Sequence, residues 1–133
     1  MFITLKKLLL SSLLLLTIPF STVASHAYDS LVNQAELRII DSDYQQALAC
    51  YNRAFASAER SFAQDLYNAG LCALQLNDNE LAMKLCLALS EKGVGPGFFA
   101  KNSIYKNLKR HKDWDWLLTK ATQDKQKLSL IHI

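Results

Sequence analysis

Small and apolar residues recur every three or four positions along most of the chain, and this spacing constrains the fold more than any other feature. Leu31, Ala35 and Ile39 form one such series, and Leu81 and Leu85 belong to another. This period places side chains on one face of an α-helix, whereas a strand would alternate every second residue. The pattern therefore predicts an all-α fold. The predicted helices cover residues 29–41, 44–57, 61–76, 78–91, 98–110 and 114–124.

Capping and breaking residues occur where these helices should begin and end. Asp43 and Asn77 are each followed three residues later by Gln or Glu, a spacing typical of capping boxes. Gly93 is suited to stopping a helix, and residues 95–97 (Gly-Pro-Gly) predict a loop. Since every connection is short, we expect consecutive helices to pack antiparallel.

The predicted helices also repeat at a constant step. Asp43, Asp78 and Asp113 follow one another at intervals of 35 residues, each just before a predicted helix. Repeats of this length are typical of stacked helix pairs, in which each pair buries a face that it could not bury alone. Helix capping explains the three aspartates without a catalytic role.

Two segments resemble tetratricopeptide repeats. DYQQALACYNRA (Asp43–Ala54) resembles the second helix of that family, and LYNAGLCALQLNDNELAMKLCLAL (Leu66–Leu89) resembles a whole unit. The resemblance implies a right-handed stack of about three antiparallel helix pairs, a TPR-like α-solenoid over residues 28–127. The third unit departs from the family pattern at Tyr105 and Leu117, as expected for a pair that closes the stack. Five aromatic residues are expected to cover its last face: Phe98, Phe99, Tyr105, Trp114 and Trp116.

The N-terminal 27 residues have the order of a secretory signal peptide. A start with two lysines is followed by an apolar run, Leu8–Ile18, and by small residues. The run is shorter than the roughly 20 residues that a membrane helix needs. Cleavage after Ala24 or after Ala27 is acceptable, and the second is preferred because it leaves Tyr28 first. An uncleaved anchor is the alternative; a cleaved chain is exported, periplasmic in a bacterium or secreted, and not stably inserted in a membrane.

The last six residues, LSLIHI (residues 128–133), stand apart from the polar helix end before them. They resemble the translated transposon end of shotgun sequencing libraries, so we expect an artefactual tail. A short strand or a docked hydrophobic tail is the other interpretation.

Composition excludes several classes of protein. Half of the 133 residues are hydrophobic, with only 4 Gly and 2 Pro, which disfavours disordered and collagen-like chains. The formal charge of +3 falls further without the signal peptide, so bulk nucleic-acid binding is not expected. Acidic residues dominate residues 28–91 and basic ones residues 92–127. This division could steer a partner, or simply reflect solvated helix faces.

The residues offer little chemistry. His111 is the only dependable histidine, in a polar turn where we expect it to be solvated. No HExxH, CxxC or Gly-rich phosphate loop occurs, so we expect no catalysis, metal or cofactor. Cys72 and Cys86 fit small buried positions of the repeat, with a disulfide between them as the less favoured alternative.

The resemblance implies a protein or peptide partner held in a concave groove by the first helix of each pair. Val32 and Glu36 occupy the positions where carboxylate-gripping members of the family have Lys and Asn, so that subtype is not expected. The chain would then be an interaction scaffold, or alternatively the N-terminal adaptor of a longer envelope enzyme or assembly factor. The groove residues carried over by position are Val32, Glu36, Ile39, Tyr67, Asn68, Leu71, Leu74, Asn102, Lys106 and Lys109.

Overall fold

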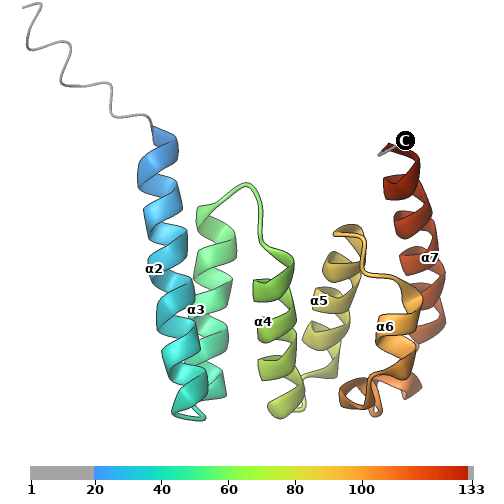
Figure 1. Cartoon of the computed structure of the whole chain (residues 1–133). Coiled ribbons are helices and arrows are strands. Elements are labelled where there is room, and N and C mark those ends of the chain that lie inside the picture. The colour runs from blue at the N-terminus through green and yellow to red at the C-terminus, as the bar shows by residue number, and fades with distance from the viewer. Residues whose placement is uncertain (1–19, 132–133) are drawn as a thin grey trace, which may run out of the picture.

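The computed structural model describes the backbone of residues 20–131 and the side chains of residues 25–131. Over this range the fold is all-α, as predicted, and consecutive α-helices run in opposite directions (Figure 1). The helices are α2 (Phe20–Ile40), α3 (Tyr44–Ser57), α4 (Ala63–Gln75), α5 (Asn79–Glu91), α6 (Pro96–Lys101) and α7 (Trp114–Ile131), with 3-10 turns η2 (Ser103–Tyr105) and η3 (Leu108–Arg110) between α6 and α7. Residues 1–19 and 132–133 lie outside the described residues. Most of the predicted signal peptide falls in the first of these ranges.

The helices pack as adjacent pairs. α2 packs on α3 and α4 on α5, while α3 meets α4, and α7 lies against both α5 and α6. Alanines permit this close packing: Ala35, Ala47, Ala69, Ala82 and Ala121 are all fully buried. A methyl group is the smallest side chain that still fills space between helices, so neighbouring backbones can approach closely.

Aspartate side chains cap two of the second helices in these pairs, as predicted. Asp43 Oδ1 accepts a hydrogen bond from Gln46 N at 3.2 Å, and Asp78 Oδ1 accepts one from Leu81 N at 3.1 Å. Each bond satisfies an amide of the first helical turn that has no partner within the helix. The predicted capping box at Asn77 was wrong by one residue, because Asp78 is the cap and Asn77 belongs to the preceding turn.

The turns before these caps are nearly identical, 35 residues apart. Ser42 and Asn77 have positive φ angles of 58° and 57°. In each turn the amide of the next residue donates at 2.9 Å to a carbonyl five residues upstream, that of Arg38 in the first turn and Ala73 in the second. This hydrogen bond and a left-handed residue characterise a helix ending of the Schellman type. The repeat seen in the sequence is therefore also a repeat of backbone conformation.

Three predicted helix boundaries were wrong. α2 begins at Phe20 rather than residue 29, because the small-residue stretch after Pro19 contains no helix breaker. The helix predicted over 98–110 is instead α6 and two 3-10 turns, with Pro96 in the first turn of α6 rather than in a loop. α7 continues to Ile131 rather than ending at residue 124, so the described part of the predicted tail, residues 128–131, is helical.

The closing aromatic residues divide into two groups. Phe99, Tyr105 and Trp114 are buried, as expected for residues that cover the end of the core. Phe98 is 41% exposed but packs its ring on Phe99 and Tyr105, whereas Trp116 is 53% exposed, so the predicted covering role was wrong for Trp116. In α7 only one of two tryptophans spaced at i and i+2 can face the core, because they lie about 200° apart around the helix.

A charged cluster also joins α5 to α7. The Lys120 ammonium lies 3.3 Å from Glu91 Oε1 and 2.5 Å from Asp124 Oδ2. Partial burial lowers the pKa of Lys120, but the hydrogen bonds to Asp124 and Glu91 outweigh it and leave the pKa raised.

Among residues 20–131, no helix is both long and apolar enough to cross a bilayer.

Candidate binding face

Helix α4 carries the centre of the candidate face, with a hollow beside each half. The first hollow, of about 380 Å³, is mostly apolar and has Tyr67, Val94 and Phe98 among its lining residues. The second, of about 220 Å³, has a mixed lining: Leu71, Leu74 and Ile104 are apolar, and the polar residues are Gln75, Asn77, Asn79 and Asn107. Three of the predicted groove residues, Tyr67, Leu71 and Leu74, therefore line depressions on the molecular surface.

Aromatic contacts hold α6 against α4 at the first hollow. The Tyr67 and Phe98 rings meet edge to face with centroids 5.9 Å apart, and Phe98 meets Phe99 in the same way at 5.5 Å. Phe99 is fully buried, so it fixes the base on which the half-exposed Phe98 stands. The first hollow therefore has one rigid aromatic wall.

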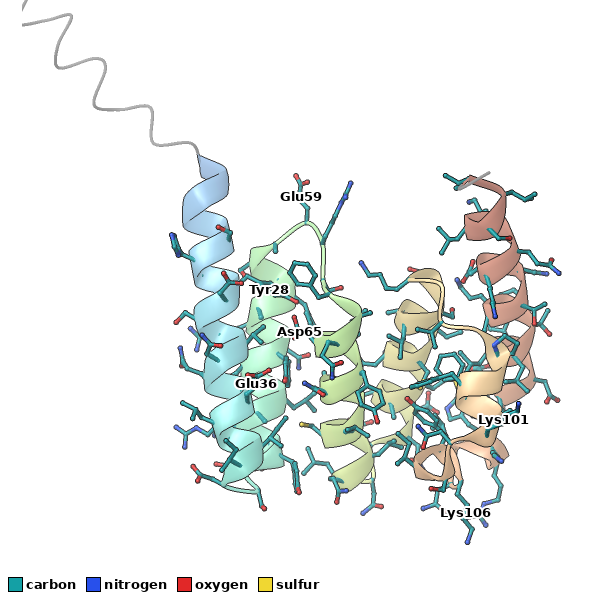
Figure 2. All side chains as sticks on the ribbon, viewed as in Figure 1. Tyr28, Glu36, Glu59, Asp65, Lys101 and Lys106 are labelled. Carbon is teal, nitrogen blue, oxygen red and sulfur yellow. The ribbon has the colours of Figure 1, made fainter. Side chains whose placement is uncertain are left out.

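Helix α2 joins α4 through a buried hydrogen bond. The Tyr28 hydroxyl donates to Asp65 Oδ2 at 2.6 Å and accepts from the Phe62 amide at 3.2 Å. Figure 2 shows Tyr28 and Asp65 pointing toward one another from the two helices. Burial and the hydrogen bond to Asp65 raise the pKa of Tyr28 well above its ordinary value, so the hydroxyl keeps its proton. This contact ties α2 to α4, which are the first helices of their two pairs.

The α2 groove residues lie away from both hollows. Val32 and Ile39 are half-buried and pack against the core, while Glu36 is exposed. None of the three lines the hollows beside α4. Of the three predicted groove residues on α2, only Glu36 is therefore exposed to a partner.

The α6 side also differs from the prediction. Asn102 Oδ1 accepts from the Ile104 amide at 3.2 Å, and Lys109 Nζ donates to the Ala100 carbonyl at 2.9 Å. Both side chains stabilise the loop that connects α6 to α7. Lys106 is exposed, and Figure 2 places it beside Lys101 on this side of the molecule.

Asn68 is occupied by a neighbour on its own helix. Gln64 Nε2 donates to Asn68 Oδ1 at 3.1 Å. Asn68 also lies near Tyr51, which is fully buried, and this burial raises the pKa of the Tyr51 hydroxyl to about 12. Asn68 therefore faces the boundary between α3 and α4 as well as the surface.

Sequence reasoning missed the α6-side walls of both hollows. Phe98 and Ile104 are 41% and 37% exposed and provide apolar surface that no groove position of the repeat assigned. The third unit is broken at Asn102, directly after α6, and this break changes which side chains reach α4. Groove positions taken from the repeat family assume a continuous helix, and α6 ends at Lys101.

The prediction that His111 is solvated was wrong. Its side chain is 7% exposed, with Nε2 lying 3.1 Å from Glu80 Oε1 and Nδ1 accepting from the Asp113 amide at 3.1 Å. The Asp113 carboxylate, expected to cap α7, has Oδ2 3.9 Å from His111 Nδ1. The turn folds beneath Glu80 and withdraws the imidazole from water.

Cys72 and Cys86 are free and buried, which agrees with the preferred interpretation and not with the disulfide. Burial raises the pKa of Cys72 to about 11 and that of Cys86 to about 12, so neither thiol is a ready nucleophile at neutral pH. Across residues 20–131, His, Cys, Asp and Glu nowhere gather in a group of three that could hold a metal ion.

Comparison with protein-family models, with curated proteins and with solved structures found no match to this chain.

Proposed function

We propose that the chain is an exported, TPR-like helical-repeat scaffold that binds an extended peptide segment of a protein partner and performs no catalysis. The observation that carries the proposal is the pair of hollows beside α4, which contain Tyr67, Leu71 and Leu74. The right-handed stacking implied by the sequence resemblance would place α2, α4 and α6 along one surface, where first helices of such repeats hold their partners.

The spacing of the hollows suggests the form of the peptide. Tyr67 and Leu74 are seven residues apart on α4, about 10 Å along the helix axis. A polyproline II segment advances about 9 Å in three residues and returns to the same side. Two apolar side chains at positions i and i+3 of such a segment could therefore enter both hollows.

Charge suggests the peptide's direction. Glu59 lies in the loop that precedes α4, and Figure 2 places Lys106 beneath α6, level with the other end of α4. A basic residue before the first apolar anchor and an acidic residue after the second would complement these ends. We therefore propose a partner segment of the form Lys-Leu-Pro-Pro-Leu-Asp.

The test is a titration of a fluorescein-labelled Lys-Leu-Pro-Pro-Leu-Asp peptide, followed by fluorescence anisotropy. The Tyr67→Ala/Lys106→Ala variant should weaken binding about tenfold or more, because one aromatic wall and one charge are lost. Its far-UV circular dichroism should be unchanged, since both side chains are partly or fully exposed.

The matched control is Leu37→Ala/Lys84→Ala, which removes an exposed apolar and an exposed basic side chain outside both hollows. It should bind as the unaltered chain does. Absence of saturable binding by the unaltered chain, or equal affinity of the two double variants, would contradict the proposal.

A further inference from the structure

A third hollow, more polar than the two beside α4, lies where the α4–α5 turn meets the loop before α7, and it shares Asn77, Asn79 and Asn107 with the second hollow. Its volume is about 600 Å³. It is lined by Asn77, Asn79, Glu80, Asn107, Arg110, His111 and Lys112. All of these side chains are polar, so the hollow is unsuited to the apolar peptide anchors proposed for the face along α4.

The lining is rich in hydrogen-bond donors. Arg110 and Lys112 are cationic and three asparagine amides can donate, whereas Glu80 is the single carboxylate. Guanidinium and amide groups match the oxygens of carboxylates and phosphates in both charge and geometry. The chemistry therefore favours an anionic ligand with hydrogen-bonding oxygens.

His111 supplies an independent indication. Because Nδ1 accepts from the Asp113 amide, the neutral ring carries its proton on Nε2. Nε2 is buried and makes no hydrogen bond of acceptable geometry, although Glu80 Oε1 lies only 3.1 Å away. A buried donor without a well-aligned acceptor is unfavourable, so an acceptor in better alignment would stabilise this ring.

Glu80 occupies the approach to that donor but is not fixed there. Its side chain is 68% exposed, while that of His111 is 7% exposed. An exposed glutamate near the start of a helix can rotate into solvent at small cost. Its departure would open Nε2 to the hollow beside Arg110.

We propose that this hollow binds the oxyanion group of a small polar ligand, held by Arg110 and by the Nε2–H of His111 after Glu80 swings aside. Lys112 and the asparagine amides contribute further charge and donors around the group. A carboxylate and a phosphate share this chemistry, and the experiment separates them.

The experiment follows the His111 ring of the full ¹⁵N-labelled chain by NMR at pH 7.5, in separate titrations with sodium phosphate and sodium acetate. Sodium chloride keeps the ionic strength constant. A saturable shift of the His111 ring nitrogens is expected with at least one anion, and the one bound more tightly identifies the source as phosphate-like or carboxylate-like.

Two variants test the residue roles. Arg110→Gln should weaken binding about tenfold or more, because a charge-assisted hydrogen bond is lost. Glu80→Gln should strengthen it, because the competing carboxylate loses its charge. Arg53→Gln, which alters an arginine on α3 outside this hollow, is the matched control and should bind as the unaltered chain does.

Shifts that grow linearly with both anions, equal affinity in Arg110→Gln, or weaker binding in Glu80→Gln would each overturn the proposal. These outcomes would leave the proposed peptide site untouched, because neither test alters Asn77, Asn79 or Asn107, the three residues that line both sites.

Discussion

One phenol ties the first helix to the third. Tyr28 is buried on α2, and its hydroxyl both donates to Asp65 and accepts from the Phe62 amide. Asp65 is itself 7% exposed, and a buried carboxylate needs such partners. The Tyr28 hydroxyl therefore satisfies two polar groups at once: the Asp65 carboxylate in α4 and the Phe62 amide just before α4.

We predict that Tyr28→Phe lowers the free energy of unfolding by about 1–3 kcal/mol, because Asp65 loses a buried donor and Phe62 N loses its acceptor. Tyr44→Phe is the control, since Tyr44 is also a tyrosine packed against the core and should cost less than about 0.5 kcal/mol. Urea denaturation followed by circular dichroism measures both. Equal losses would show that the hydrogen bonds of Tyr28 add nothing to stability.

Helices α3, α4 and α5 were predictable because local and tertiary preferences agree in them. α3 has the predicted bounds, and α4 and α5 differ from theirs by one or two residues. The 98–110 segment fails because Asn102 bonds the Ile104 amide and thereby competes with helix continuation. Periodicity alone does not reveal such a local bond, and so the walls contributed by Phe98 and Ile104 escaped prediction.

Two glycines provide a matched prediction for the helical elements. A Cβ at Gly70, within α4, would lie 3.9 Å from Leu85 Cβ, which is ordinary contact. Gly70→Ala should therefore raise the free energy of unfolding by up to about 1 kcal/mol through higher helix propensity, and with it the melting temperature.

Gly93→Ala should lower the melting temperature instead. Gly93 ends α5 with a φ of 94°, and a Cβ there would lie 2.9 Å from Leu128 Cδ1. Differential scanning calorimetry of the two variants measures opposite changes. A gain in Gly93→Ala would contradict the role of its left-handed conformation.

At the scale of the molecule, each helix contacts only near neighbours in the sequence. α3, α4 and α5 each have a helix packed on both sides and hold much of the core, including Tyr51, Cys72 and Met83. The sequence repeat made this order predictable. The face along α4 was predictable only in part, because half of its lining depends on how a departing third unit folds.

Burial of ionisable groups predicts weaker folding in alkali. Cys72 and Cys86 have pKa values raised from 9.0 to about 11 and about 12 in the fold. Above pH 9 the unfolded chain releases these protons while the folded chain keeps them, so stability falls as pH rises toward 11–12. Each thiol should cost about 1.4 kcal/mol per pH unit within that window.

Urea denaturation with reductant at pH 8 and pH 10 measures the loss. Cys86→Ala should show a smaller pH dependence than the unaltered chain, whatever its stability at pH 8. The raised pKa of Lys120 acts in the same direction, since its ion pairs are lost as it deprotonates. Stability that stays constant between the two pH values would contradict the prediction.

The length of α2 bears on the order of folding and of the proposed signal-peptide cleavage. Helix α2 begins at Phe20 and runs through Ala24 and Ala27, the two residues after which a signal peptidase is expected to cut. Proteases act on opened backbone rather than on an intact helix. If the proposed signal peptide is removed, cleavage and completion of α2 would therefore compete in time, and the cut would have to come before the Tyr28 hydroxyl reaches Asp65.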